Sequence, residues 1–169
     1  MKNYVVCLKW GNKYSPEYVN RLYNMVSRNC TIPFEFVCVT ENSKGITENV
    51  KILPLQTKNG VQGWWYKPMF FSSEFPLKGN LLFMDLDVIV FRNIDKLFNY
   101  NPGKFCIIRD FPVPRKNIIP INMNSSVFRV QTGQYSFIYD EFINDLSVTK
   151  KFHGDQDWIY HKLKDKEYE

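Results

Sequence analysis

The chain has 169 residues, of which 44% are hydrophobic and 17% aromatic, and it carries a net charge of +5 at pH 7. A composition this apolar excludes disorder, and the length fits a single domain with a full core. We therefore expect one domain over residues 1–169. No stretch reaches the roughly 18 unbroken apolar residues of a membrane-spanning helix, and the N-terminal residues lack a signal-peptide pattern.

The net charge and the cysteines indicate which classes of ligand and which cellular compartment to expect. A charge of +5 suits anionic ligands such as nucleotides, but the basic residues are dispersed rather than striped with aromatics, so nucleic-acid binding is not expected. The four cysteines are widely spaced and form no C-x-x-C pair: Cys7, Cys30, Cys38 and Cys106. We expect reduced thiols and a cytoplasmic protein.

The N-terminal third alternates strand, helix and strand. Ser15-Pro16 is typical of a helix start, and apolar positions recur at three and four as far as about Arg28. The strands are expected at Tyr4–Leu8, Phe34–Val39 and Val50–Leu53. This order is that of an α/β sheet.

The rest of the chain continues the alternation. Trp64–Phe75 is expected to be largely helical, with Pro68 tolerated in its first turn. A proline-rich segment, Phe111–Pro120, contains the basic pair Arg115-Lys116 and cannot be a central strand. It is a candidate for a lid or for an element on the substrate side. Other elements are expected at Leu81–Phe91 (strand), Ile94–Phe98 (helical turn), Phe105–Ile108 and Ser125–Val130 (strands), and Gly133–Leu146 and Asp155–Leu163 (helices).

The strand Leu81–Phe91 carries the most informative residues, because Asp85 and Asp87 interrupt an otherwise apolar run. Two carboxylates on one face of a strand lie about 7 Å apart or closer and lose hydration together. A hard divalent cation, Mn²⁺ or Mg²⁺, would neutralise both. The alternative is that they reach solvent at a turn or cap the segment near Asn93.

In order and spacing, the motifs of this chain resemble the GT-A nucleotide-sugar glycosyltransferases, most closely the retaining enzymes of glycosyltransferase family 8. The matching pieces span nearly the whole chain: Asn12 and Tyr14 after the first strand, Tyr66-Lys67, Asp85-Leu86-Asp87, Asn124-Ser125-Ser126, and Asp155-Gln156-Asp157. The resemblance implies an α/β fold with a mixed central sheet flanked by helices. It also implies metal-dependent, retaining transfer of a hexose from UDP-glucose or UDP-galactose to a carbohydrate, lipid or protein acceptor.

The resemblance also implies roles for individual residues. Leu8, Lys9 and Trp10 would line the base pocket, Tyr14 would stack on uracil, and Thr40 with Glu41 would lie near the base or ribose. Lys67 would contact the donor sugar and diphosphate, and Asp85 and Asp87, flanking Leu86, would bind the metal. Asn124 and Ser125 would lie near the transferred sugar, Asp155 would bind it, Gln156 would lie beside the anomeric carbon, and Asp157 completes that motif. His153 is the candidate third metal ligand, because the histidine motif of the family is missing from this sequence.

Plainer alternatives stand beside these roles. Tyr14 could be an ordinary core or surface tyrosine, Thr40 part of a turn, Lys67 a solvated lysine, and Asp155 the N-cap of the last helix. Two other functions stay open: a haloacid dehalogenase-like phosphohydrolase with Asp85 as nucleophile, and a non-catalytic carbohydrate-binding protein using Trp64, Trp65 and Tyr66 as a platform.

Overall fold

The computed structural model describes residues 1–58, 60–110, 123–164 and 166. In these residues a six-stranded sheet has the order β3-β2-β1-β4-β6-β5. β1, β2, β3 and β4 run parallel, whereas β6 is antiparallel to both of its neighbours, so the sheet is mixed as expected. The strands are β1 (Asn3–Lys9), β2 (Glu35–Thr40), β3 (Lys51–Pro54), β4 (Asn80–Met84), β5 (Cys106–Arg109) and β6 (Met123–Gln131).

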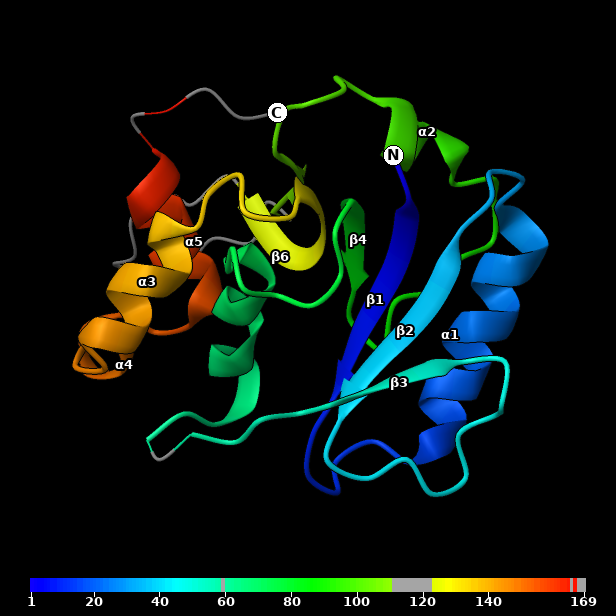
Figure 1. Ribbon diagram of the computed structural model, residues 1–169, viewed down its shortest axis with the longest axis horizontal. Helices are drawn as coiled ribbons and strands as arrows, with labels where there is room; N and C mark the ends of the chain where they lie inside the picture. The colour runs from blue at the N-terminus through cyan, green and yellow to red at the C-terminus, as the bar shows by residue number, and fades with distance from the viewer. Residues whose placement is uncertain (59, 111–122, 165, 167–169) are drawn as a thin grey trace.

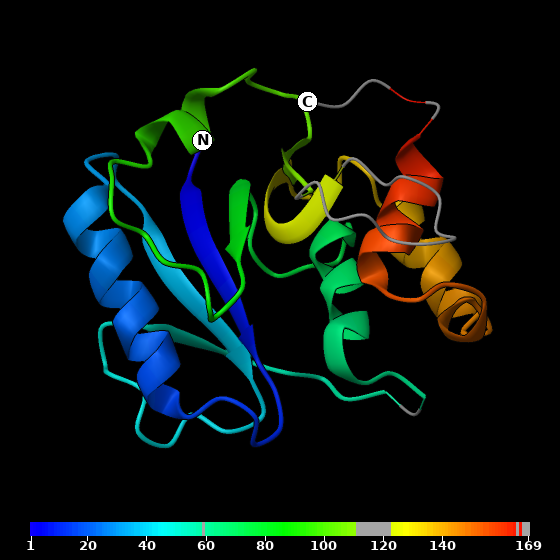
Figure 2. The same ribbon diagram turned by 180° about the vertical axis from the view of Figure 1, so that it is seen from behind.

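Helices cover both faces of this sheet (Figures 1 and 2). One face packs against α1 and α2, and the other against η1, α3 and α5. The helical elements are α1 (Pro16–Asn29), the 3₁₀ helix η1 (Gly63–Phe71), α2 (Asp95–Asn99), α3 (Phe137–Asn144), α4 (Val148–Lys151) and α5 (Asp155–Leu163). Because the parallel strands β1 and β4 are central, their carboxyl ends meet at one edge, where α/β proteins bind ligands.

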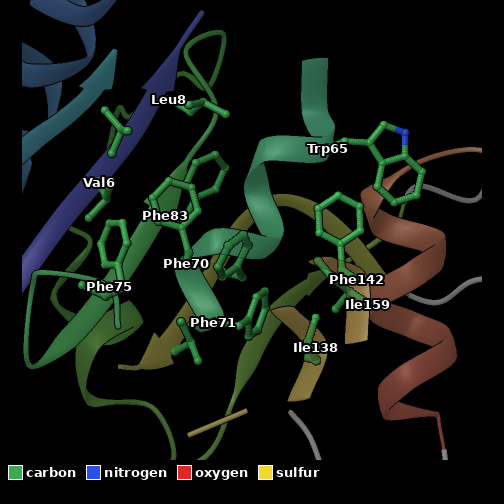
Figure 3. Packing of buried hydrophobic residues seen from close by; sticks show 14 of the residues in the cluster. Val6, Leu8, Trp65, Phe70, Phe71, Phe75, Phe83, Ile138, Phe142 and Ile159 are labelled. Carbon is green, nitrogen blue, oxygen red and sulfur yellow. The ribbon is translucent and has the colours of Figure 1, made fainter. Parts of the chain in front are cut away.

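The core on the η1 side is built largely from aromatic rings (Figure 3). Phe128 of β6 stacks on Phe83 of β4 and on Phe71 of η1, with ring centroids 4.9 and 5.5 Å apart. Trp65 stacks on Phe142 of α3 at 5.6 Å. Each such ring removes a large apolar area from water, so η1 is held firmly against the sheet.

The strand expected over Leu81–Phe91 is shorter than predicted. β4 ends at Met84, and the Asp85 N–H donates to the Ser126 carbonyl at 2.8 Å before the chain turns. The following residues leave the sheet and run beside α1, where the Asn29 side chain donates to the Val90 carbonyl. Ile89 is consequently 74% exposed, although its apolar sequence context predicted burial.

The segment expected to be a helix over Trp64–Phe75 is a 3₁₀ helix that ends at Phe71. Pro68 lies in its interior rather than in the first turn. A 3₁₀ helix has three residues per turn, so side chains three apart lie above one another. Trp64 and Lys67 form one such column, and buried Trp65 and Phe71 belong to another.

Three further expectations concern the helix after Gly133, the cysteines and the proline-rich segment. The helix expected over Gly133–Leu146 is shorter and is followed by the separate helix α4. All four cysteines are free thiols, as expected. The segment Phe111–Pro120, including Arg115 and Lys116, lies outside the described residues. Among the helices that are described, none has the length and apolar character to cross a membrane.

Candidate active site

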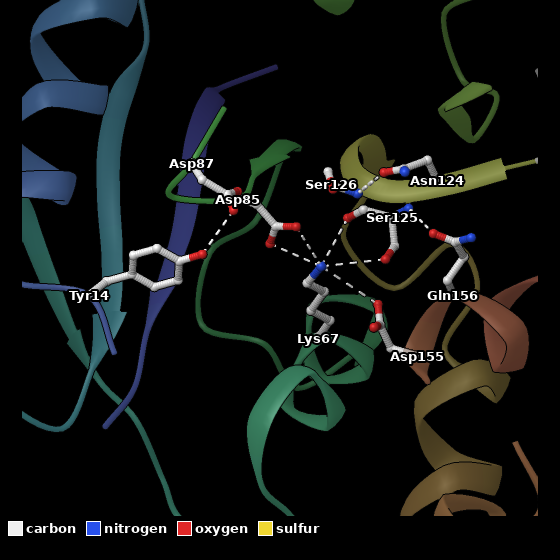
Figure 4. A network of polar contacts seen from close by, with 9 residues as sticks. All are labelled: Tyr14, Lys67, Asp85, Asp87, Asn124, Ser125, Ser126, Asp155 and Gln156. Carbon is white, nitrogen blue, oxygen red and sulfur yellow. Dashed lines mark hydrogen bonds and ion pairs between the residues drawn. The ribbon is translucent and has the colours of Figure 1, made fainter. Parts of the chain in front are cut away.

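The two aspartates lie in the turn that follows β4, at the carboxyl edge of the sheet (Figure 4). Asp87 accepts a hydrogen bond from the Tyr14 hydroxyl at 2.8 Å. This bond joins the turn after β4 to the loop between β1 and α1. Both burial and the bond to Asp87 raise the pKa of Tyr14, so its hydroxyl stays protonated as the donor.

Lys67 of η1 reaches the same turn and is the cation at the centre of the site (Figure 4). Its Nζ lies 3.0 Å from both carboxylate oxygens of Asp85 and 3.8 Å from Oδ2 of Asp155. It also donates to the Ser125 carbonyl at 3.3 Å. Lys67 is only 6% exposed, so it is not a solvated lysine, and it lies mid-helix rather than at a helix start.

Asp155 is the most deeply buried acid of the site. It is the first residue of α5 rather than its N-cap, which is Gly154, and its carboxylate is directed toward Lys67 instead of capping the helix. Burial raises the pKa of Asp155 to about 6, and the nearby Lys67 limits the rise. Oδ2 of Asp155 is buried without a hydrogen-bond partner, so a ligand that donates a hydrogen bond could satisfy it.

The amino-terminal residues of β6 connect to this cluster through hydrogen bonds. The Ser125 N–H donates to Oε1 of Gln156 at 3.2 Å, which fixes the amide of Gln156 next to Asp155. The Asn124 side chain accepts from the Ser126 N–H at 2.9 Å and donates to Asp110 at 3.1 Å. Asp110 is a residue that the sequence motifs did not indicate.

A pocket of about 370 Å³ opens at this edge of the sheet. The residues that line it come from β1, the loop after it, η1, the turn after β4 and α5: Leu8, Trp10, Lys13, Tyr14, Trp64, Lys67, Asp85, Leu86, Asp87 and Asp155. Eight of these ten were predicted site residues. Lys13 was not, and Trp64, which is 50% exposed, had been considered only as part of a carbohydrate platform.

Eight predicted residues do not line this pocket. Asn124, Ser125 and Gln156 belong to the hydrogen-bonded cluster beside it, and Glu41 accepts a hydrogen bond from the Gly11 N–H. The other four lie apart from the pocket. Lys9 and Thr40 are paired in register and lie on the α1 side of the sheet, opposite Leu8, because side chains alternate along a strand. The Thr40 hydroxyl forms a turn with Asn42 instead. His153 is exposed and Asp157 is half-buried on α5.

The oxygen donors of the pocket fit a hard divalent cation. Asp85 and Asp87 both line it, and burial raises the pKa of Asp85 while Lys67 opposes the rise. Within the described residues, no group of three or more His, Cys, Asp or Glu side chains could hold a metal ion. Two carboxylates suffice for Mg²⁺ or Mn²⁺ when substrate phosphates complete the coordination.

The raised pKa of Asp155 predicts a specific pH dependence of stability. The folded protein holds the proton more tightly than the unfolded chain, whose carboxyl has the ordinary value of 3.8, so this stabilisation is present below about pH 4 and is lost as the pH rises through about 6. An asparagine at this position does not titrate, so Asp155→Asn should not lose this stabilisation as the pH rises. The free energy of unfolding of Asp155→Asn, minus that of the wild type, should therefore increase by a few kcal/mol between about pH 4 and pH 7. Urea unfolding of both proteins at several pH values measures it. A constant difference across that range would contradict the raised pKa.

Comparison with known structures identifies the fold of the chain. No protein-family model and no curated protein sequence matches the chain. The glycosyltransferase GlyE of Streptococcus pneumoniae TIGR4 superposes with a TM-score of 0.68 over 99% of this chain and 44% of GlyE, at 14% identity. The galactosyltransferase LgtC, in complex with donor and acceptor sugar analogs, gives 0.62 over 93% of this chain and 69% of LgtC, also at 14% identity. Mouse xyloside xylosyltransferase 1 gives 0.56, with 98% and 84% of the two chains covered and 14% identity.

The chain has the GT-A fold. The mixed sheet and flanking helices expected from the motif order are therefore confirmed. The chain spans less than half the length of GlyE.

Proposed function

We propose that this chain is a metal-dependent glycosyltransferase that transfers a hexose from UDP-glucose or UDP-galactose to an acceptor hydroxyl with retention of configuration. The observation that carries the proposal is the polar cluster at the carboxyl ends of β1 and β4, where Tyr14, Lys67, Asp85, Asp87 and Asp155 meet in one pocket. The shared fold with three sugar-transferring enzymes supports the reaction class. Retention rests on the resemblance to family 8.

The nucleoside end of the donor fits the wall formed by β1 and the loop after it. Leu8 and Trp10 line this wall, and Tyr14 offers a ring for the base while its hydroxyl holds Asp87. Lys9 and Thr40 belong to this proposal only through the backbone of their strands.

The diphosphate fits the turn after β4. Asp85 and Asp87 would hold Mn²⁺ or Mg²⁺, which when bound supplies positive charge to the departing nucleoside diphosphate. The Asp87 carboxylate is oriented by Tyr14, and the Asp85 carboxylate by Lys67. These contacts would preorganise both carboxylates for the metal. His153 as a further metal ligand stays a prediction.

The sugar end fits the side of the pocket made by η1 and α5. Oδ2 of Asp155, which is ion-paired with Lys67 but has no hydrogen-bond partner, would accept a hydrogen bond from a donor-sugar hydroxyl. Gln156 is held next to Asp155 by the Ser125 N–H and would lie beside the anomeric carbon. An active-site glutamine of LgtC has been substituted by glutamate in a second LgtC structure, which superposes with a TM-score of 0.66 at 13% identity over 93% of this chain and 69% of LgtC.

Titration calorimetry of uridine diphosphate tests the proposal. We expect binding in the presence of Mn²⁺ and loss of binding when a chelator replaces the metal, because the carboxylates of Asp85 and Asp87 would otherwise repel the diphosphate. Uridine, which lacks the phosphates, is the matched control and should bind weakly in both conditions. No binding of uridine diphosphate with metal would contradict the proposal and favour a carbohydrate-binding protein.

The release of inorganic phosphate would distinguish a phosphohydrolase from a glycosyltransferase. In the haloacid dehalogenase family the acidic strand opens the domain, whereas β4 is here the fourth strand along the chain. Glycosyl transfer predicts no phosphate release from a generic aryl phosphate. The fold comparisons support the glycosyltransferase over this alternative.

A further inference from the structure

A line of exposed apolar and basic side chains lies directly beside the candidate active site. Ile89 and Phe91 are each 74% exposed, whereas Val90 between them is 7% exposed and packs in the core on the α1 side. Successive residues of this extended segment therefore point alternately inward and outward. Two large apolar side chains this exposed are not explained by the packing of the described residues.

The segment that carries them is anchored between the two exposed residues, at Val90, and again after them, at Ile94. The Asn29 side chain donates to the Val90 carbonyl at 3.3 Å, and the Ile94 N–H donates to the Asn29 carbonyl at 2.8 Å. Figure 2 shows this segment running from the end of β4 toward α2, alongside α1. Ile89 and Phe91 are thus presented on a fixed support.

Basic side chains accompany the aromatic rings along this surface. The Arg92 guanidinium lies 5.5 Å from the centroid of the Phe91 ring, and the Arg21 guanidinium lies 6.0 Å from that of Tyr18. Tyr18 packs edge-on against Tyr14 at 4.9 Å, and Lys13 covers the Tyr14 ring.

This surface adjoins the donor pocket through Lys13 and Tyr14, which also line the pocket. The Tyr14 hydroxyl binds Asp87, which stands two residues before Ile89. The acidic side chains among these contact partners are Asp87, which lines the pocket, and Glu17, which pairs with Arg21 at 2.9 Å. The three cations, Lys13, Arg21 and Arg92, therefore outnumber the two acidic side chains on this surface.

We propose that Ile89, Phe91 and Tyr18, together with Lys13, Arg21 and Arg92, form a docking surface for an anionic membrane. Apolar side chains that enter the headgroup region and cations that meet anionic lipids are the two attractions that hold a peripheral protein on a bilayer. Docking through this surface would place the turn that carries Asp85 and Asp87 near the bilayer, where a lipid-linked acceptor would be presented. That last consequence rests on the proposed function, whereas the docking itself does not.

Co-sedimentation with vesicles tests the docking without donor, acceptor or metal. Wild-type protein should sediment with vesicles of equal amounts of phosphatidylcholine and phosphatidylglycerol, and less with phosphatidylcholine alone. The Ile89→Ser plus Phe91→Ser variant should bind the mixed vesicles at least about tenfold more weakly, because the two apolar side chains that would enter the headgroup region are lost. Arg92→Gln should weaken binding to the mixed vesicles only, and added salt should weaken wild-type binding.

Control variants and alternative partners make the outcome decisive. Tyr100→Ser removes an aromatic residue that is 56% exposed elsewhere on the surface and should bind as wild type does. The circular dichroism of each variant shows that the exposed substitutions leave the fold intact. Wild-type protein that stays in the supernatant, or a double serine variant that sediments fully, would overturn the proposal. Concentration-dependent dimerisation that the double variant abolishes, without vesicle binding, would overturn it in favour of a second copy of the chain.

Discussion

Replacing Asp85 and Asp87 together by alanine should lower the rate of donor-sugar hydrolysis or transfer by about 10³-fold or more. The substitution removes both carboxylates proposed to hold the metal, and the loss of its charge at the leaving diphosphate corresponds to about 4 kcal/mol of transition-state stabilisation. Metal-dependent binding of uridine diphosphate should disappear in the same variant. Rates of sugar release from UDP-glucose and UDP-galactose, measured with saturating Mn²⁺, provide the test.

A matched control separates this effect from a general loss of negative charge. Glu141→Ala plus Asp145→Ala removes two carboxylates that are about half exposed and that pair with Lys162 and Lys151. Ion pairs of carboxylates this exposed contribute little to stability. This control should retain wild-type activity and binding. If the Asp85 and Asp87 variant kept the wild-type rate, the metal assignment would be wrong, while the fold would be unaffected.

Lys67→Met should destabilise the protein by about 3–5 kcal/mol, a large part of the stability of an ordinary domain. The substitution keeps the length of the side chain but leaves the carboxylates of Asp85 and Asp155 without their cation. The loss should be smaller at about pH 5 than at about pH 7.5, because Asp155 is then largely protonated and needs no counter-charge. Urea unfolding at the two pH values measures both effects.

Two further variants make the role of Lys67 falsifiable. Lys78→Met alters an exposed lysine and should change the free energy of unfolding by less than about 0.5 kcal/mol. Lys67→Met combined with Asp155→Asn should recover part of the lost stability, because one of the two stranded charges is gone. Equal stabilities of the Lys67→Met and Lys78→Met proteins would contradict the buried network.

Local sequence patterns predicted the sheet well where each strand is apolar along its whole length. They failed after Met84, because Leu86, Val88 and Val90 are as apolar as the strand residues before them. What ends β4 is tertiary: its pairing with β6 stops at Met84 and Val127, and the chain then packs beside α1. Periodicity within a single segment carries no information about where a partner strand ends.

The candidate site was likewise predictable from the sequence only in part. The order of motifs predicted that Lys67, Asp85 and Asp155 serve one site, but not that the lysine binds both carboxylates, since these contacts join residues far apart in sequence. The orientation of Lys9 was available from the sequence, because it alternates with Leu8 along one strand and both cannot face one pocket. The exposure of Trp64 depends on the 3₁₀ winding of η1, which its composition does not indicate.

The tight winding of η1 makes its length a strict requirement. Trp64 lies above Lys67 only because three residues complete a turn; winding as an α-helix would offset the two side chains by about 60°. One residue inserted between Trp65 and Tyr66 would bring Trp65 above Lys67 and remove it from its stack on Phe142. Sequence change in η1 is therefore expected to proceed by substitution rather than by insertion or deletion, whichever sugar or acceptor a relative of this chain selects.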